Sequence, residues 1–237
     1  MLLRSYRDSD IVARIVENVE AAPIPEIHKR VFRFARRFTQ RSWETRESDI
    51  QALREAGLPD SEIALWASRA AGQTWFVMSA DGGGVALDVA LSLRDETLHR
   101  NDLALKLLDR PQSAALDARR HAMVRARVSA LNQCTYSRTT TRALLEQASG
   151  DADLWQRVTA DEPRFEDPAD QRVVELATRL ARSAYKVTAR DAEGLRQAGL
   201  TDEAYVEVLN TTALQTSLDR LANTLGVVPD EQPVLAA

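Results

Sequence analysis

The segment ALNQCTYSRTTTRALLEQA, residues 130–148, contains Cys134, the only cysteine of the 237-residue chain. A small hydroxyl, Ser137, stands three residues later, where a second thiol would complete a C-x-x-C pair. A single thiol can still attack an electrophile, or be oxidised to a sulfenic acid that an external thiol reduces again. A free cysteine can equally be an ordinary buried residue that packs like a small apolar side chain. Both interpretations of Cys134 stay open at this point.

Hydroxyl side chains follow the cysteine and could line the same site. The candidate catalytic residues are therefore Cys134, Tyr136, Ser137 and Thr141. A serine nucleophile needs a neighbouring base, and the sequence places none beside Ser137. Serine and threonine are also common near helix N-termini for structural reasons alone, and Tyr136 could equally be a packing residue.

Four polar residues close to the cysteine are candidates for binding a substrate: His121, Arg125, Arg127 and Asn132. An arginine in a pocket lined by hydroxyls would suit a small molecule that carries a carboxylate. His121 could instead face solvent or cap a helix. The three histidines are dispersed and there is no cysteine cluster, so we expect no metal site and no cofactor.

A helical hairpin must position these residues. Apolar residues recur at helical spacing in LDARRHAMVRARVSALNQ, which predicts a helix over 116–133. A turn at Asn132-Gln133 then leads into a second helix, 134–148. A further helix is predicted over 95–108, before a break at Pro111. No segment reads as a convincing β-strand, so the fold class is all-α.

The chain also repeats itself. When the sequence is shifted by 142 positions, residues 31–85 align with 173–227 without a gap, and 16 of the 55 positions are identical. Chance similarity between two amphipathic segments would rarely hold register over that length. We infer a duplicated unit.

Each unit is predicted to contain three helices. In the second copy, Asp167-Pro168 supplies a cap and a first-turn proline, Thr188 begins a short helix that ends near Gly199, and a long helix runs from Asp202 to Thr224. The corresponding helices of the first copy are predicted at 26–42, 46–56 and 60–80. The glycine run DGGG that follows lacks the Gly-Lys-Ser/Thr of a phosphate-binding loop, so it indicates a helix-terminating turn.

Composition excludes several classes of partner. The net charge of −4 gives no reason to expect nucleic acid or an anionic membrane surface as a partner. A single cysteine cannot form an intramolecular disulfide, and no apolar leader or 18-residue apolar run is present. We therefore expect a protein that is soluble and cytoplasmic.

The hairpin resembles the thiol hairpin of the carboxymuconolactone decarboxylase and AhpD-like alkylhydroperoxidase superfamily. The likeness lies in ARVSALNQCTY, through Arg127, Val128, Ser129, Leu131, Asn132, Cys134 and Tyr136, and in the downstream LRQAGLTDEAY and LANTLGV. It covers roughly 92–227, and the repeat extends it to 31–85. The resemblance implies a partial AhpD-like helical unit over 1–90 and an AhpD-like domain over 91–237 that carries the hairpin, 116–148; the two could form one globule.

In peroxidases of this superfamily, two cysteines at a helix start cycle between dithiol and disulfide while a glutamate and a histidine move protons. Carried over to this chain, the first cysteine is Cys134, but Ser137 stands in place of the second. The histidine falls on Thr141 and the glutamate on Ala122. The resemblance therefore implies the fold without the dithiol peroxidase cycle.

Three functions remain as hypotheses. The first is an enzyme that acts on a small organic substrate, such as a carboxylate, a lactone or a biosynthetic intermediate, by non-dithiol chemistry of the lyase or isomerase type. The second is a non-catalytic binding or scaffold protein, and the third is a residual single-cysteine peroxidase. The family commonly forms oligomers, so we also expect a homo-oligomer, a dimer or a trimer.

Overall fold

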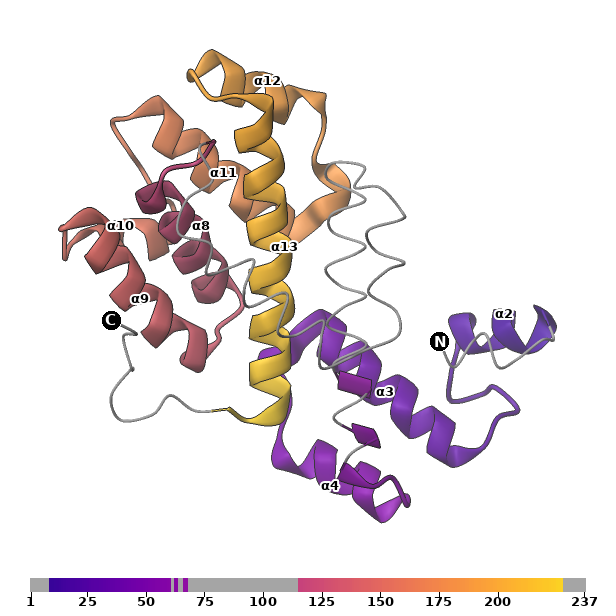
Figure 1. Ribbon diagram of the computed structural model, residues 1–237. Helices are drawn as coiled ribbons and strands as arrows, with labels where there is room; N and C mark the ends of the chain where they lie inside the picture. The colour runs from indigo at the N-terminus through magenta and orange to yellow at the C-terminus, as the bar shows by residue number, and fades with distance from the viewer. Residues whose placement is uncertain (1–8, 61, 64–65, 68–114, 228–237) are drawn as a thin grey trace.

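The computed structural model describes residues 9–60, 62–63, 66–67 and 115–227, and every regular element in these ranges is helical (Figure 1). In chain order they are α2 (Ser9–Glu17), α3 (Glu26–Arg41), η1 (Ser42–Glu44), α4 (Glu47–Glu55), α8 (Ala118–Leu131), α9 (Thr135–Ser149), α10 (Leu154–Thr159), α11 (Pro168–Ser183), η2 (Ala184–Lys186), α12 (Ala189–Gln197) and α13 (Asp202–Leu225). The all-α prediction is confirmed. The sequence analysis missed α2 and α10, both of them short.

The longest helix, α13, runs through the middle of the molecule (Figure 1). Helices α8 and α11 pack along it, and α8 also packs against α9 to form the predicted hairpin. A core of fully or almost fully buried aliphatic residues joins α8, α11, α12 and α13: Leu116, Val124, Val128, Val173, Leu176, Ala177, Leu180, Leu195, Val208, Leu209 and Ala213. Burial of this apolar surface is the main force that holds the hairpin against α13.

Helix boundaries follow the local signals in the sequence. The Asp117 carboxylate accepts a hydrogen bond from the Arg120 backbone N–H at 2.8 Å and so begins α8. The Asp167 carboxylate caps α11 in the same way through Ala169, with Pro168 in the first turn as expected. The hairpin helices therefore begin slightly later than predicted, at residues 118 and 135 rather than 116 and 134.

The internal repeat is visible in the helices themselves. Helices α3 and α11, turns η1 and η2, and helices α4 and α12 start and end at positions that differ by 142 residues in every case. A glycine follows α4 in the first copy and α12 in the second. These glycines, Gly57 and Gly199, both have a positive φ, of 93° and 84°. The predicted helices at 60–80 and 95–108, the DGGG turn and both sides of the proposed boundary at residue 90 lie wholly or largely outside the described residues.

The two units pack against different parts of α13. The α11–α12 unit contacts its first half through Val208 and Leu209, whereas Leu221, near its end, packs against the α3–α4 core that contains Phe34 and Phe38. The Asn223 amide also approaches the Ser42 hydroxyl at 3.4 Å. One long helix thus joins both copies of the repeat.

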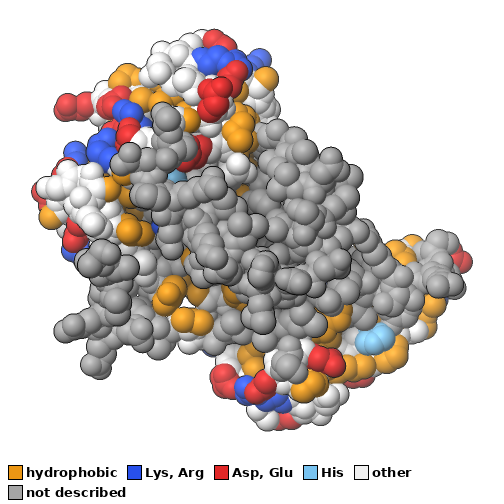
Figure 2. Space-filling model, viewed as in Figure 1, with side chains coloured by type: hydrophobic (Ala, Val, Ile, Leu, Met, Phe, Trp, Pro, Cys, Tyr) orange, Lys and Arg blue, Asp and Glu red, His pale blue; other side chains and the backbone are white. Residues whose placement is uncertain are grey.

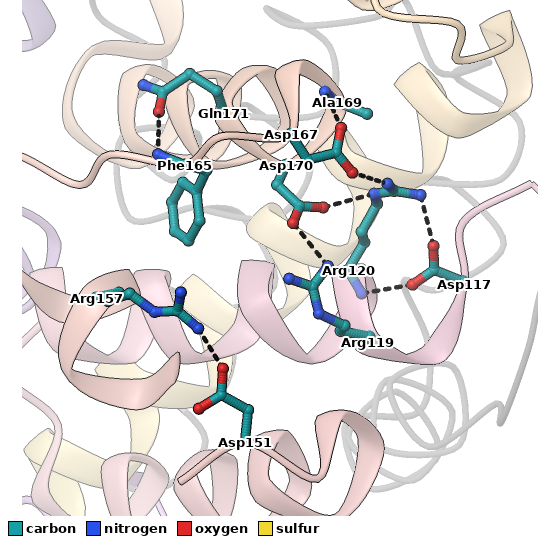
Figure 3. Close-up of polar contacts among 10 residues, drawn as sticks. All are labelled: Asp117, Arg119, Arg120, Asp151, Arg157, Phe165, Asp167, Ala169, Asp170 and Gln171. Atoms are coloured by element: carbon teal, nitrogen blue, oxygen red, sulfur yellow. Dashed lines mark hydrogen bonds and ion pairs between the residues drawn. The ribbon is translucent and has the colours of Figure 1, made fainter. Parts of the chain in front are cut away.

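A buried carboxylate links the start of α8 to the start of α11 (Figure 3). Asp170 is 2% exposed and accepts hydrogen bonds from Arg119 at 2.7 Å and from Arg120 at 2.8 Å. Arg120 also donates to Asp117 and Asp167. The helix dipole disfavours positive charge in the first turn of α8, where Arg119 and Arg120 lie. Their ion pairs with these acidic residues compensate for that unfavourable interaction.

The described surface at the α12 end of the molecule is mixed in charge (Figure 2). Lysine and arginine side chains alternate with aspartate and glutamate at the end of the molecule formed by α12 (Figure 2), where Arg196 pairs with Asp202 at 2.8 Å and with Glu193 at 3.1 Å. None of the described helices combines the length and apolar composition that crossing a bilayer requires.

Candidate functional site

Cys134 lies at the bend of the α8–α9 hairpin, as the sequence predicts. It is the N-cap residue of α9, and its backbone N–H donates to the Ser129 carbonyl at 3.1 Å. The residue before it, Gln133, has a φ of 51°, a left-handed conformation that lets the chain reverse direction between the two helices. The side chain of Cys134 is fully buried.

The thiol is held in its protonated form. Its sulfur lies 3.4 Å from the Ser137 hydroxyl oxygen. Burial, followed by the negative charge of Asp219, raises the pKa of Cys134 to about 11, although hydrogen bonds from Ser137 and Tyr136 act in the opposite direction. Because the thiolate is the reactive nucleophile, this environment suppresses thiolate chemistry near neutral pH.

The negative charge beside the thiol comes from Asp219, on α13, a residue that the sequence analysis did not select. Its side chain is fully buried. One carboxylate oxygen accepts from the Asn132 amide at 2.9 Å, and the other accepts from the Gln215 amide at 2.7 Å and from the Ser129 hydroxyl at 3.4 Å. The Ser137 hydroxyl lies close enough to lower the pKa of this carboxyl as well.

The Asp219 carboxyl is poised to exchange a proton near neutral pH. Burial raises its pKa to about 6, against hydrogen bonds from Asn132, Ser137, Gln215 and Ser129 that each lower it. Desolvation of the charged form therefore outweighs four donors. A carboxyl group with a pKa in this range can act as a general base or acid.

Further polar contacts fix the position of this cluster. Arg125 is 6% exposed, and its Nε donates to the side-chain amide oxygen of Gln215 at 3.0 Å. This bond orients the amide nitrogen of Gln215 toward Asp219. Asn223 donates to the Asn132 backbone carbonyl at 3.1 Å. Burial lowers the pKa of the neighbouring Arg220 to about 10, and the charge of Asp219 opposes that change.

The structure brings together four of the eight predicted site residues: Arg125, Asn132, Cys134 and Ser137. Thr141 is buried one turn beyond Ser137, but its hydroxyl donates to the Ser137 backbone carbonyl at 2.7 Å. Tyr136 is half-buried and makes none of the side-chain hydrogen bonds of the cluster. His121 is half-buried in the first turn of α8, at the opposite end of that helix from Asn132.

Arg127 lies on a different side of α8. Its guanidinium donates to the Thr178 hydroxyl at 2.8 Å and to the Ala160 backbone carbonyl at 2.6 Å, just after the end of α10. Residues two positions apart on a helix point about 200° from each other, so Arg127 faces away from Ser129 and Asp219. It does not approach the thiol.

A sequence signal for Asp219 existed. Gln215 and Asp219 stand four positions apart in a stretch, TTALQTSLDRLANTL, that must be largely buried if the long helix is central. The repeat supplies a second signal, since the position equivalent to Asp219 in the first copy is Val77. An acidic residue in one copy only marks a feature that the shared fold does not need.

The described ranges contain no group of three or more histidine, cysteine, aspartate or glutamate side chains arranged to hold a metal ion. The cluster around Asp219 is a hydrogen-bonded carboxylate–hydroxyl–thiol site, and proton transfer is the chemistry that its groups can perform.

Comparison with solved structures identifies the architecture. A peroxidase-related protein from Silicibacter sp. superposes with a TM-score of 0.51 at 21% identity, over 74% of this chain and 87% of the other. An alkylhydroperoxidase AhpD core protein, also described as peroxidase-related, from Ralstonia eutropha gives the same TM-score at 24% identity, over 74% and 88% of the two chains. The chain has the AhpD-like fold. No family model and no curated protein matches it.

Proposed function

We propose that this AhpD-like chain is an enzyme that transfers protons on a small organic substrate, with Asp219 as the general acid or base. The observation that carries the proposal is the fully buried Asp219 carboxylate, held by Asn132, Gln215 and Ser129 and close enough to the Cys134 thiol for its charge to raise the pKa of that thiol. This arrangement supplies the base that the sequence alone did not place. The substrate class remains a carboxylate, a lactone or a biosynthetic intermediate.

Each residue of the cluster has a defined part in this chemistry. Asn132 and Gln215 hold the two carboxylate oxygens and fix their direction. Ser137 can accept a proton from one side and donate one to Asp219 on the other, because a hydroxyl is both donor and acceptor. Cys134 contributes a neutral S–H donor next to that hydroxyl. Positioning of these groups before the substrate binds is the source of the rate enhancement.

A peroxidase function is disfavoured by the same geometry. Peroxide reduction by cysteine needs a thiolate, and both burial and the charge of Asp219 oppose its formation. Ser137 cannot form a disulfide with an oxidised Cys134. Peroxide consumption with an external thiol donor should therefore be equal, and near background, for the wild type and for Cys134→Ser.

The test of acid–base catalysis uses two matched variants. A thermal-shift panel of small carboxylates, lactones and aromatic metabolites first finds a ligand, and its turnover is then followed by mass spectrometry. We expect activity to rise with pH through about 6 if Asp219 acts as a base. Asp219→Asn should lose about a hundredfold or more in rate, whereas Cys134→Ser, which keeps a donor, should stay within about tenfold of the wild type. Loss of rate in Cys134→Ser alone would replace this proposal with thiol chemistry.

A non-catalytic scaffold is the second candidate, and one observation favours it. Three donors of the chain itself already bind the Asp219 carboxylate, so the network can serve purely to fix the hairpin against α13. The scaffold hypothesis predicts that no member of the panel is turned over, and that Asp219→Asn changes stability only.

A further inference from the structure

A second polar site lies on the other side of α8 from Asp219. It is a groove of about 390 Å³ between α11, the segment 161–164 and η2. Arg127, Thr178, Arg179, Arg182 and Lys186 line it. A volume of this size falls at the lower end of the range of small-molecule sites, about 300 to 1,000 Å³.

Most charges at the rim of the groove are already paired. Arg179 binds Asp191 at 2.6 Å, and Glu162 lies 3.4 Å from Arg164. The Glu175 carboxylate accepts from Arg172 at 2.9 Å and from the Gln171 amide at 2.8 Å. After these pairs, Asp161 is the acidic residue of the described lining whose carboxylate forms no ion pair.

Three cations are not balanced in this way. Arg127 is 2% exposed and gives its hydrogen bonds to Thr178 and to the backbone carbonyls of Val158, Ala160 and Asp161, all of them neutral acceptors. Among the described residues, Arg182 and Lys186 form no ion pair with a carboxylate. The Lys186 ammonium lies over the ring of Tyr185, with 5.6 Å between its nitrogen and the ring centre.

The charges of Arg127 and Arg182 act on each other. Burial and then the positive charge of Arg182 lower the pKa of Arg127, and the charge of the Asp161 carboxylate opposes them. The four hydrogen bonds of Arg127 also leave one of its five N–H groups unused. An anion placed in the groove would relieve the repulsion between the two guanidinium groups and accept bonds from both sides.

We propose that this groove binds a small doubly charged oxyanion, a phosphate monoester or a dicarboxylate, held by Arg182 and Lys186 above the buried charge of Arg127. Arg182 and Lys186 are exposed at the rim and can close on the ligand, whereas Arg127 is fixed by the carbonyls after α10. The site is separate from the Asp219 cluster, so its failure would leave the proposed acid–base function untouched.

The test is a titration of the full-length wild-type protein with inorganic phosphate, glycerol phosphate and succinate in chloride buffer at constant ionic strength. Binding is followed by amide chemical shifts and by calorimetry. We expect saturable shifts at residues 161–164 and 178–186 at ligand concentrations up to about 10 mM, the range in which a weak small-ligand site saturates. Comparison of the affinities for glycerol phosphate and succinate shows whether the groove prefers a phosphate monoester or a dicarboxylate.

Exposed variants make the proposal falsifiable without risk to folding. Arg182→Gln and Lys186→Gln should each weaken binding by about tenfold, because each removes a charge-assisted hydrogen bond. The control is Arg190→Gln, which removes an exposed cation of α12 that does not line the groove, and which should leave the affinity within about twofold. Equal affinities in Arg182→Gln and Arg190→Gln, or no saturable binding of any of the three anions, would overturn the proposal.

Discussion

The sulfur of Cys134 lies 3.4 Å from the hydroxyl oxygen of Ser137, and both side chains are buried. In a dithiol site the equivalent pair would be two sulfurs able to form a bond. Here the second position holds a hydroxyl, which cannot form a disulfide and which instead helps to lower the pKa of the nearby Asp219 carboxyl. In this hairpin the residues at the first and fourth positions, Cys134 and Ser137, are joined by a hydrogen bond.

The first prediction concerns the reactivity of the thiol. With its pKa raised to about 11, Cys134 is a thiolate in only about one molecule in 10,000 at pH 7. Native protein should therefore react with iodoacetamide at least about a hundredfold more slowly than the same protein unfolded in urea, where the thiol has its ordinary pKa. Mass spectrometry of the alkylated product measures both rates.

Asp219→Asn is the matched variant for this experiment. Removal of the negative charge next to the sulfur should lower the pKa of Cys134 and speed alkylation, with burial still the larger restraint. A wild-type thiol that reacts as fast in the folded protein as in urea would contradict the structure and reopen the peroxidase hypothesis.

The second prediction is a pH dependence of stability that comes from Asp219. Its pKa is raised from 3.8 in the unfolded chain to about 6 in the folded protein. The folded state therefore holds the proton more tightly, so the free energy of unfolding falls as pH rises from about 4 to about 6 and is level above that range. The two pKa values correspond to a loss of about 3 kcal/mol.

Denaturant unfolding at a series of pH values measures this effect. Other carboxyl groups also titrate in that range, so the wild-type curve is compared with that of Asp219→Asn. The difference between the two curves should change between pH 4 and 6 and be constant above pH 7. Parallel curves over the whole range would mean that Asp219 is not desolvated as the structure has it.

Local signals in the sequence predicted the hairpin and the repeat well. The identical positions of the two copies include the arginine and aspartate residues that form their ion pairs and the glycines that end α4 and α12. Such interactions join residues within about a dozen positions of one another. A pattern of spacing and capping residues is enough to find them.

The site was harder to predict because its contacts are long-range. Asp219 binds Ser129 and Asn132 across 90 and 87 positions, and sequence alone does not say which face of α13 meets the hairpin. Arg127 shows the same limit: its place near Cys134 in the sequence suggested a shared pocket, but its side chain faces α10 and α11. Tertiary packing decides such contacts.

The third prediction tests whether the two copies of the repeat work in the same way. Asp49 and Asp191 occupy equivalent positions, and each accepts one bond from a helix N-cap backbone N–H, at 2.9 and 2.8 Å. Each also accepts one from an arginine, Arg37 at 2.5 Å and Arg179 at 2.6 Å. Alanine at either position should lower the free energy of unfolding by about 1 to 2 kcal/mol.

The side chain of Asp191 is 10% exposed and that of Asp49 is 22% exposed, so Asp191→Ala should have the larger effect. The two aspartates share no bonding partner, and the double variant should lose the sum of the two single effects. Urea unfolding measures all three variants. If one substitution were silent while the other destabilised the protein, the equivalence of the two copies would be wrong in energetic terms.

The fourth prediction uses the repeat as a guide to substitution at Gly194. Its equivalent in the first copy is Ala52, and an arginine reaches over both positions: Arg30 donates to the Ala52 carbonyl at 2.9 Å, and Arg172 would lie 3.6 Å from a Cβ at residue 194. That distance is an ordinary contact. Gly194→Ala should therefore raise the free energy of unfolding by about 0.5 to 1 kcal/mol, because alanine is the better helix residue.

Gly199 provides the opposite case in the same helix–turn unit. It has a φ of 84°, and Gly57 has the same conformation at the equivalent position, so both copies keep glycine there. Gly199→Ala should lower the free energy of unfolding by about 1 to 2 kcal/mol, since an L-residue is strained in that conformation even with open space around its Cβ. Because a Cβ would make no close contact at either position, opposite signs in urea unfolding would reflect the different backbone conformations of the two glycines. If both substitutions changed the free energy of unfolding in the same direction, the backbone conformation of one of the two glycines would be wrong.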